Sequence, residues 1–129
     1  ACGDAAGSTP RILASDRDAG AVRAAQANAE RAGVSELIEF SCKALSAVEP
    51  PPAPGWIVTN PPYGVRLKES GDLRDLYARF GQVLREKCPG WHAAVLCGDL
   101  RLMRSAALSY KTELLSMSGG LKVSLAVVR

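Results

Sequence analysis

Short apolar runs alternate along the chain with segments whose hydrophobic and polar residues follow a helical spacing. Four of the apolar runs have the length of strands, and they span residues 11–15, 37–41, 56–59 and 93–97. The last of them is apolar throughout, which is typical of a strand buried on both faces of a parallel sheet. Because strands that alternate with helices indicate βαβ units, the pattern predicts an α/β fold with a parallel sheet.

Three segments carry the signals of amphipathic helices, and an aspartate stands where each helix would be capped. After Asp18, apolar residues recur at three- and four-residue intervals up to a stop at Gly33. After Asp72, a stronger pattern runs to Pro89-Gly90, and Asp99 precedes a shorter helix. The inward positions of the three helices are Val22, Ala25, Ala29 and Ala32; Leu73, Leu76, Tyr77, Phe80, Val83 and Leu84; and Leu100, Met103 and Ala107.

The end of the chain has a different pattern from the rest. Residues 112–117 and 121–127 flank Gly119-Gly120, and the second run alternates with period two, which predicts an antiparallel hairpin. The proline-rich residues 50–55 predict an exposed loop. Residues 1–10 are small and polar, which is typical of a disordered lead-in. One domain over residues 11–129, with a parallel sheet that ends in an antiparallel hairpin, is therefore expected.

Three polar sites fall at the carboxyl ends of predicted strands. Asp16 follows the first run, Asn60 follows the run at 56–59, and Gly98-Asp99 follows the last one. In open α/β sheets, ligands bind outside the carboxyl ends of the strands. These three sites therefore predict one edge of the sheet as the active-site edge.

The segment Asn60-Pro61-Pro62-Tyr63 carries the most specific chemistry. Two successive prolines exclude a helix and remove two backbone donors, so the turn is rigid and its carbonyls are free to accept hydrogen bonds. The side-chain oxygen of Asn60 and the carbonyl of Pro61 form a pair of acceptors that suits an NH2 group. Tyr63 adds a ring on which a planar base can stack. Holding both hydrogens of an exocyclic base amine turns its lone pair toward an electrophile, and such orientation lowers a reaction barrier.

These residues resemble the hallmark of class I amino-methyltransferases that act on base amines. They are similar above all to the THUMP-containing RNA guanine-N2 methyltransferases of bacteria and archaea. In that family, a strand ends in Asp-x-Asp, a helix contains an Asn-Ala step, and Asn-Pro-Pro-Tyr-Gly precedes an arginine. The matching residues over positions 11–129 are Asp16-Arg17-Asp18, Asn28-Ala29, Asn60-Pro61-Pro62-Tyr63-Gly64, Arg66 and the closing Gly119-Gly120-Leu121.

The resemblance implies a Rossmann-like class I methyltransferase fold and S-adenosyl-L-methionine (SAM) as the cofactor. Asp16 would accept hydrogen bonds from the ribose hydroxyls, as a carboxylate at a strand end does in such folds. Ala44 stands where the family usually has an acidic residue that meets the adenine amine. The implied cofactor-binding residues are Asp16, Arg17, Ala44 and Asn60. The implied catalytic residues are Asn60, Pro61, Pro62 and Tyr63, and Tyr63 and Arg66 would contact the substrate.

One part of the family pattern is missing from this sequence. The glycine-rich loop that follows the family's first strand is absent, because no strand precedes Gly3 or Gly7. That strand would lie between the strands at 11–15 and 56–59. We therefore expect the chain to be a fragment of a longer enzyme and to bind SAM weakly or not at all alone. We also expect an RNA-binding domain upstream in the full-length protein.

The amino-acid composition limits the binding partners and the cellular compartment to be expected for this protein. The net charge is +3, from 16 Lys and Arg against 13 Asp and Glu, which is compatible with nucleic acid but far below a self-sufficient basic surface. No apolar run is long enough to span a membrane. Four cysteines without a CxxC pair, and a single histidine, predict reduced, mostly buried thiols and no metal site in a cytoplasmic protein.

Three functions stay open at this stage. The favoured one is SAM-dependent methylation of guanine N2 in ribosomal RNA, with RNA preferred over DNA as the substrate. A DNA adenine-N6 methyltransferase is the alternative among enzymes, because both amines require the same acceptor geometry. The third is a Rossmann-like scaffold without catalysis, although such a module would not need two acceptors beside a stacking ring.

Overall fold

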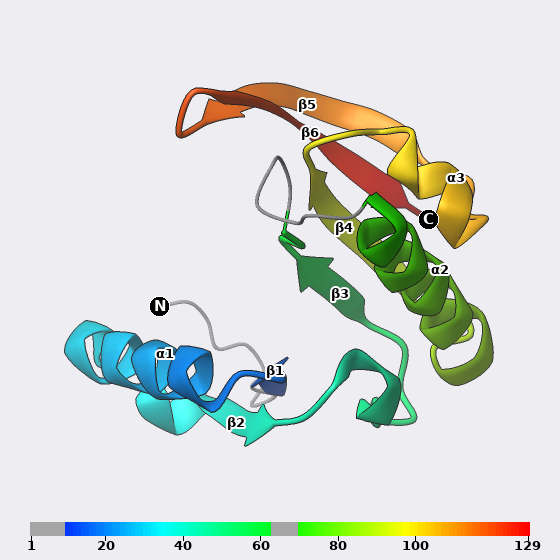
Figure 1. The fold of residues 1–129 in the computed structure, drawn as a ribbon. Helices are drawn as coiled ribbons and strands as arrows, with labels where there is room; N and C mark the ends of the chain where they lie inside the picture. The colour runs from blue at the N-terminus through cyan, green and yellow to red at the C-terminus, as the bar shows by residue number, and fades with distance from the viewer. Residues whose placement is uncertain (1–9, 63–69) are drawn as a thin grey trace. The chain divides into compact units, whose positions relative to one another are not determined.

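The computed structural model describes residues 10–62 and 70–129, and the chain divides into two compact units, Ala1–Val48 and Glu49–Arg129 (Figure 1). The elements of the first unit are β1 (Ile12–Asp16), α1 (Ala19–Ala32), the 3-10 turn η2 (Ser35–Leu37), β2 (Ile38–Cys42) and the 3-10 turn η3 (Leu45–Ala47). The elements of the second are β3 (Trp56–Thr59), α2 (Ser70–Lys87), β4 (His92–Cys97), α3 (Leu102–Ala106), β5 (Lys111–Ser118) and β6 (Leu121–Val128).

The first unit is a parallel βαβ arrangement of β1, α1 and β2. Strands β1 and β2 pair in parallel register from Ile12 opposite Ile38 to Asp16 opposite Cys42. The Asp18 side chain accepts a hydrogen bond from the Gly20 amide at 3.0 Å, which caps α1 as predicted. The helix ends at Gly33, whose φ of 73° is the left-handed conformation that glycine adopts without a steric penalty.

The burial of β1 differs from the prediction. Ile12 and Leu13 are 45% and 42% exposed, whereas a buried strand was expected. In the described part of the chain, β2 is the sole strand that pairs with β1, so one backbone edge of β1 has no strand beside it. The second predicted strand begins one residue later than expected, because Leu37 closes the 3-10 turn η2.

The second unit contains a four-stranded sheet in the order β3-β4-β6-β5. Strands β3 and β4 are parallel, whereas β6 runs antiparallel to both β4 and β5. Gly119 and Gly120, both with positive φ, form the turn between β5 and β6. The predicted parallel sheet with a closing antiparallel hairpin is thereby confirmed, although the described strands form two separate sheets.

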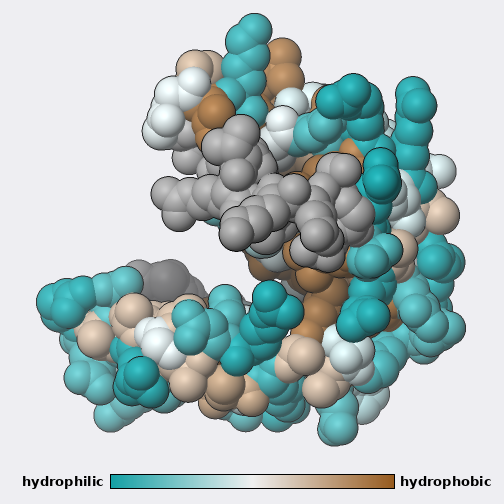
Figure 2. Space-filling model, viewed as in Figure 1, coloured by the Kyte–Doolittle hydropathy of each residue, from teal (hydrophilic) through white to brown (hydrophobic). Residues whose placement is uncertain are grey.

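Among the described elements of this unit, helix α2 contributes the largest number of buried hydrophobic side chains. Five of its predicted inward residues are buried to 8% exposure or less: Leu73, Tyr77, Phe80, Val83 and Leu84. Gly81 lets α2 approach α3 closely, because a Cβ there would lie 1.9 Å from the Ala106 carbonyl oxygen. The polar outer face of α2 is visible as hydrophilic surface in Figure 2.

Three local predictions in this unit need correction. Asp72 lies inside the first turn of α2 and does not cap it, because the helix begins at Ser70. Along β4, buried and half-buried residues alternate, so this strand is fully covered on one face and not on both. Ala106, with no exposed surface, faces the core in α3, whereas Ala107 is its exposed left-handed C-cap.

Within residues 10–62 and 70–129, no helix combines the length and the apolar composition that crossing a membrane requires.

Candidate active site

The carboxyl ends of β3 and β4 form one edge of the second unit. The two parallel strands pair from Trp56 opposite His92 to Thr59 opposite Val95. Asn60 follows the last paired residue of β3, and Gly98-Asp99 follows Cys97 at the end of β4. The structure therefore brings two of the three predicted strand-end sites to the same edge of one sheet.

The segment Asn60-Pro61-Pro62 follows β3 and has no regular secondary structure. Asn60 is exposed and Pro61 is half-buried. Among the described residues, the Asn60 side chain has no hydrogen-bond partner, so its oxygen is available to accept one. Tyr63 and Arg66, the predicted stacking and substrate-binding residues, lie outside the described residues.

In the first unit, Asp16 and Arg17 lie at the carboxyl end of β1. One oxygen of Asp16, Oδ1, accepts the Asp18 amide at 2.8 Å, and the Asp16 carbonyl accepts the Lys43 amide at 3.0 Å. The Cys42 thiol lies 3.5 Å from the Arg17 carbonyl oxygen, to which it donates. The carboxyl ends of β1 and β2 are thus tied together, and Ala44 follows as the residue that precedes η3.

A small open hollow lies beside Asp16 within the first unit. Its volume is about 140 Å³, and apolar side chains such as Val22, Ala25 and Phe40 form much of its wall. Pockets for small molecules usually measure about 300–1,000 Å³, so this hollow has room for part of a ligand. The predicted cofactor-binding set is divided between the units: Asp16, Arg17 and Ala44 lie in the first, and Asn60 lies in the second.

Asp99 accepts hydrogen bonds from both the backbone and the side chain of Arg101, which is more than the capping role predicted for it. Its Oδ1 accepts the Arg101 amide at 3.0 Å, so it caps the turn that precedes α3. Its carboxylate also pairs with the Arg101 guanidinium, through Nε at 3.0 Å and Nη2 at 2.9 Å. These hydrogen bonds hold the pKa of Asp99 below its usual value. The sequence prediction overlooked Arg101, although an arginine two residues after a strand-end aspartate could have indicated the pair.

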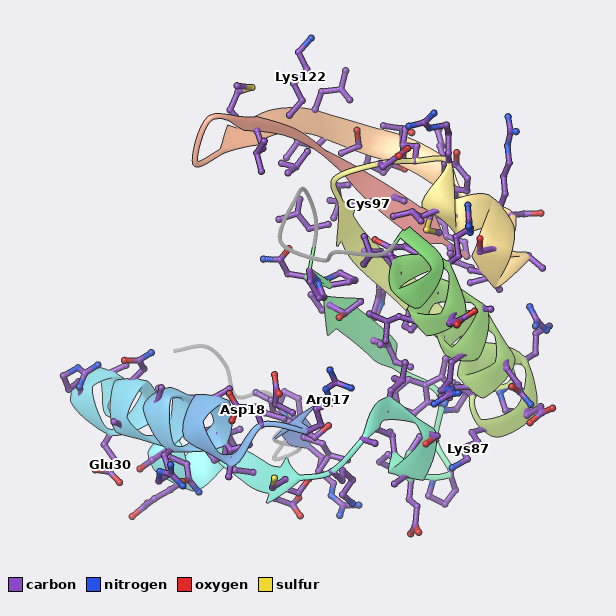
Figure 3. The ribbon with its side chains drawn as sticks, in the orientation of Figure 1. Arg17, Asp18, Glu30, Lys87, Cys97 and Lys122 are labelled. Carbon is purple, nitrogen blue, oxygen red and sulfur yellow. The ribbon has the colours of Figure 1, made fainter. Side chains whose placement is uncertain are left out.

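A buried polar contact lies under the same strand end. The Tyr77 hydroxyl of α2 donates to Cys97 Sγ at 3.3 Å, and the Cys97 thiol donates to the Asp99 carbonyl at 3.0 Å. Burial, followed by the contact with Cys97, raises the pKa of Tyr77 well above its usual value. Figure 3 shows Cys97 at the end of β4, beside α2. The helical and strand patterns predicted both residues as core but gave no indication of this contact.

The sequence predicted reduced and mostly buried thiols. Cys88 and Cys97 are free and buried, as predicted, whereas Cys42 is free but exposed. In residues 10–62 and 70–129, no group of three or more His, Cys, Asp or Glu side chains is placed to hold a metal ion.

Several known proteins are similar to this chain in sequence or in fold. A model of the family described as "RMKL-like, methyltransferase domain" matches residues 3–125. Ribosomal RNA large subunit methyltransferase K/L from Shewanella sp. (strain W3-18-1) is 39% identical over 112 residues, which are 87% of this chain and 16% of that protein.

Two solved structures are similar to this one. SMU.472, crystallised in complex with SAH, has a TM-score of 0.82 and 24% identity, over 91% of this chain and 31% of its own. A predicted N6-adenine-specific DNA methylase from Listeria monocytogenes str. 4b F2365 has a TM-score of 0.70 and 27% identity, over 88% and 29%.

The α/β fold is that of the class I SAM-dependent methyltransferases. This chain belongs to the RMKL-like methyltransferase domain family, whose model matches nearly its whole length. It spans about 16% of the length of the Shewanella relative.

Proposed function

We propose that the intact protein transfers a methyl group from SAM to an exocyclic base amine of nucleic acid, with guanine N2 of ribosomal RNA as the favoured target. The observation that carries this proposal is the position of Asn60-Pro61-Pro62 directly at the carboxyl end of β3. Family membership and a relative named for ribosomal RNA methylation support it.

The proposed role of this segment is to hold and orient the amine. Asn60 Oδ1 and the Pro61 carbonyl would each accept one N–H of the target amine. Because both hydrogens of the amine point toward these two acceptors, the nitrogen lone pair points away from them. Orientation of this kind contributes up to roughly 7–11 kcal/mol of barrier reduction in favourable cases. Tyr63 would stack on the base, which contributes roughly 1–3 kcal/mol to binding, and Arg66 would contact the substrate.

SAM is the proposed methyl donor, and it supplies an activated methyl group when bound. Asp16 has one carboxylate oxygen, Oδ2, without a hydrogen-bond partner among the described residues, and we assign it to the ribose hydroxyls. The apolar wall beside Asp16 suits part of the adenosine. Arg17 and Ala44, at the same edge of the first unit, are the other cofactor-binding residues that we propose there. The shared fold with SMU.472, which was crystallised with SAH, is consistent with this cofactor.

The test is methyl transfer by the intact protein from labelled SAM to unmodified ribosomal RNA, followed by identification of the product nucleoside. Asn60→Ala should abolish transfer and leave the circular dichroism spectrum unchanged, because Asn60 is exposed. Gln26→Ala, which removes an exposed amide side chain from α1, is the matched control and should retain activity. Activity that survives Asn60→Ala would refute the proposed mechanism.

A second candidate function is DNA adenine-N6 methylation. It is favoured by the similarity to the Listeria protein, which is described as a predicted N6-adenine-specific DNA methylase. Guanine N2 and adenine N6 are both NH2 groups conjugated to a ring, so the same acceptor pair serves either. Transfer to DNA with N6-methyladenine as the product would select this candidate. We also propose an upstream RNA-binding domain in the intact protein, because the net charge of +3 on this chain is far below that of a self-sufficient basic surface.

A further inference from the structure

Arg101 presents an exposed guanidinium that is nevertheless held in one orientation. Its side chain is 83% exposed, yet Asp99 binds its Nε and Nη2 groups through both carboxylate oxygens. The Nη1 group and one hydrogen of Nη2 have no partner among the described residues. A planar donor fork with free N–H groups and a fixed direction matches the geometry of a phosphate group.

The turn that carries Asp99 and Arg101 is anchored in the core. The Asp99 carbonyl accepts hydrogen bonds from the Cys97 thiol and from the Leu102 amide, both at 3.0 Å. Cys97 in turn accepts the Tyr77 hydroxyl, and these two side chains are 0% and 1% exposed. A chain of hydrogen bonds therefore runs from the buried phenol of α2, through the end of β4, to the residue that orients Arg101.

This turn lies at the same sheet edge as Asn60. Strands β3 and β4 are parallel neighbours with Thr59 opposite Val95, so the two segments leave adjacent strands in the same direction. From the strand spacing and the rise per residue, Asp99 lies on the order of 10 Å from Asn60. Enzymes that modify one base also contact the nucleotides that flank it.

We propose that Arg101 binds a backbone phosphate that flanks the target base, and that Tyr77 and Cys97 are positioning residues for it. This inference rests on the proposed function, because it requires a nucleic-acid substrate at the edge that contains Asn60. Contacts to phosphate fix the register of a protein on nucleic acid without reading its sequence. Arg101 thus sets where along the strand the target base enters, whereas Asn60 and Pro61 select an amine.

The first test compares Arg101→Ala with wild type in the intact protein, with in vitro transcribed large-subunit ribosomal RNA as the probe. The KM for RNA should rise roughly five-fold, as expected for an exposed charge pair, whereas kcat and the KM for SAM stay unchanged. The slope of log KM against log salt should fall by about 0.7–0.9, the value for one phosphate contact. Arg104→Ala, which removes an exposed arginine of α3 near Arg101 in the chain, is the matched control and should change neither quantity.

The second test separates positioning from general stability. Tyr77→Phe keeps the buried ring and removes only the hydroxyl, so it should raise the KM for RNA less than Arg101→Ala does, with kcat retained. Because Tyr77 acts through Arg101, Tyr77→Phe should have no further effect on KM in the Arg101→Ala background. Equal effects of Tyr77→Phe in both backgrounds would overturn the positioning role.

The outcomes distinguish this inference from the proposed function. If wild type transfers methyl groups to RNA and Arg101→Ala leaves both KM and the salt slope unchanged, the phosphate contact is wrong and the function stands. If wild type transfers none, the proposed function fails, and RNA binding measured by fluorescence anisotropy still tests Arg101. An unchanged Kd and salt slope in that measurement would overturn the contact.

Discussion

The close contact between α2 and α3 makes Gly81→Ala the sharpest test of the packing. A Cβ at this position would lie 1.9 Å from the Ala106 carbonyl oxygen, and real Cβ contacts essentially never fall under 3.0 Å. Helix α3 would have to move by about 1.1 Å. Arg85 Nη1 donates to the same oxygen at 2.7 Å, so a movement of that size also disturbs this charge-assisted hydrogen bond.

The expected loss of stability follows from three contributions. Overpacking a tight contact costs roughly 1–3 kcal/mol, and weakening a hydrogen bond to a charged group costs roughly 1.5–3 kcal/mol when it is lost in full. Alanine in place of glycine returns about 1 kcal/mol inside a helix. The net decrease in the free energy of unfolding should therefore be about 2 kcal/mol.

Urea unfolding followed by tryptophan fluorescence measures this loss, because both tryptophans, Trp56 and Trp91, belong to the second unit. Ala78→Gly, at an exposed position of α2, is the matched control and should lose about 1 kcal/mol through helix propensity alone. Gly81→Ala changes propensity in the opposite direction and should still lose more. A Gly81→Ala variant as stable as wild type would refute the close packing of α2 on α3.

Two further predictions concern pH. Burial raises the pKa of Tyr77 above its usual value near 10, so its contribution to stability is complete below about pH 10 and is lost as the pH rises further. Tyr77→Phe should shift alkaline unfolding, followed by circular dichroism, to higher pH, whereas Tyr110→Phe, at a 38% exposed position, should not. The hydrogen bond from Arg101 lowers the pKa of Asp99, so this pair stabilises the fold above about pH 4 and less as the pH falls. Asp99→Asn should therefore reduce the difference in unfolding free energy between pH 7 and pH 3, and an unchanged difference would contradict the pairing.

The sequence predicted the boundaries of helices and strands correctly where the residues that set a boundary are close neighbours in the chain. Asp18 and Gly33 bound α1 because a cap and a left-handed glycine act within one turn of the helix. The boundaries of β3 were predicted to the residue, since the prolines on both sides exclude a strand. By contrast, Asp72 was misassigned as a cap, because α2 begins two residues earlier, at Ser70.

Features that depend on contacts between distant residues could not be predicted from the sequence. The exposure of Ile12 depends on which strands flank β1, and a strand's own residues do not encode its neighbours. The contact of Tyr77 with Cys97 joins residues twenty positions apart on different elements, and both patterns had assigned them as ordinary core. The strand-end positions of Asn60 and Asp99 were predictable, because the carboxyl ends of parallel strands meet at one edge.

The two prolines after Asn60 also decide how ligand binding at this edge can be observed. Because Pro61 and Pro62 carry no N–H, backbone amide signals and hydrogen exchange are silent for both residues. The side-chain NH2 of Asn60 is itself a pair of observable protons attached to the group that would receive the substrate. Isotope labelling of asparagine side chains, of which the chain has only Asn28 and Asn60, would therefore give two pairs of proton signals, one pair that reports on the site and one that serves as its reference.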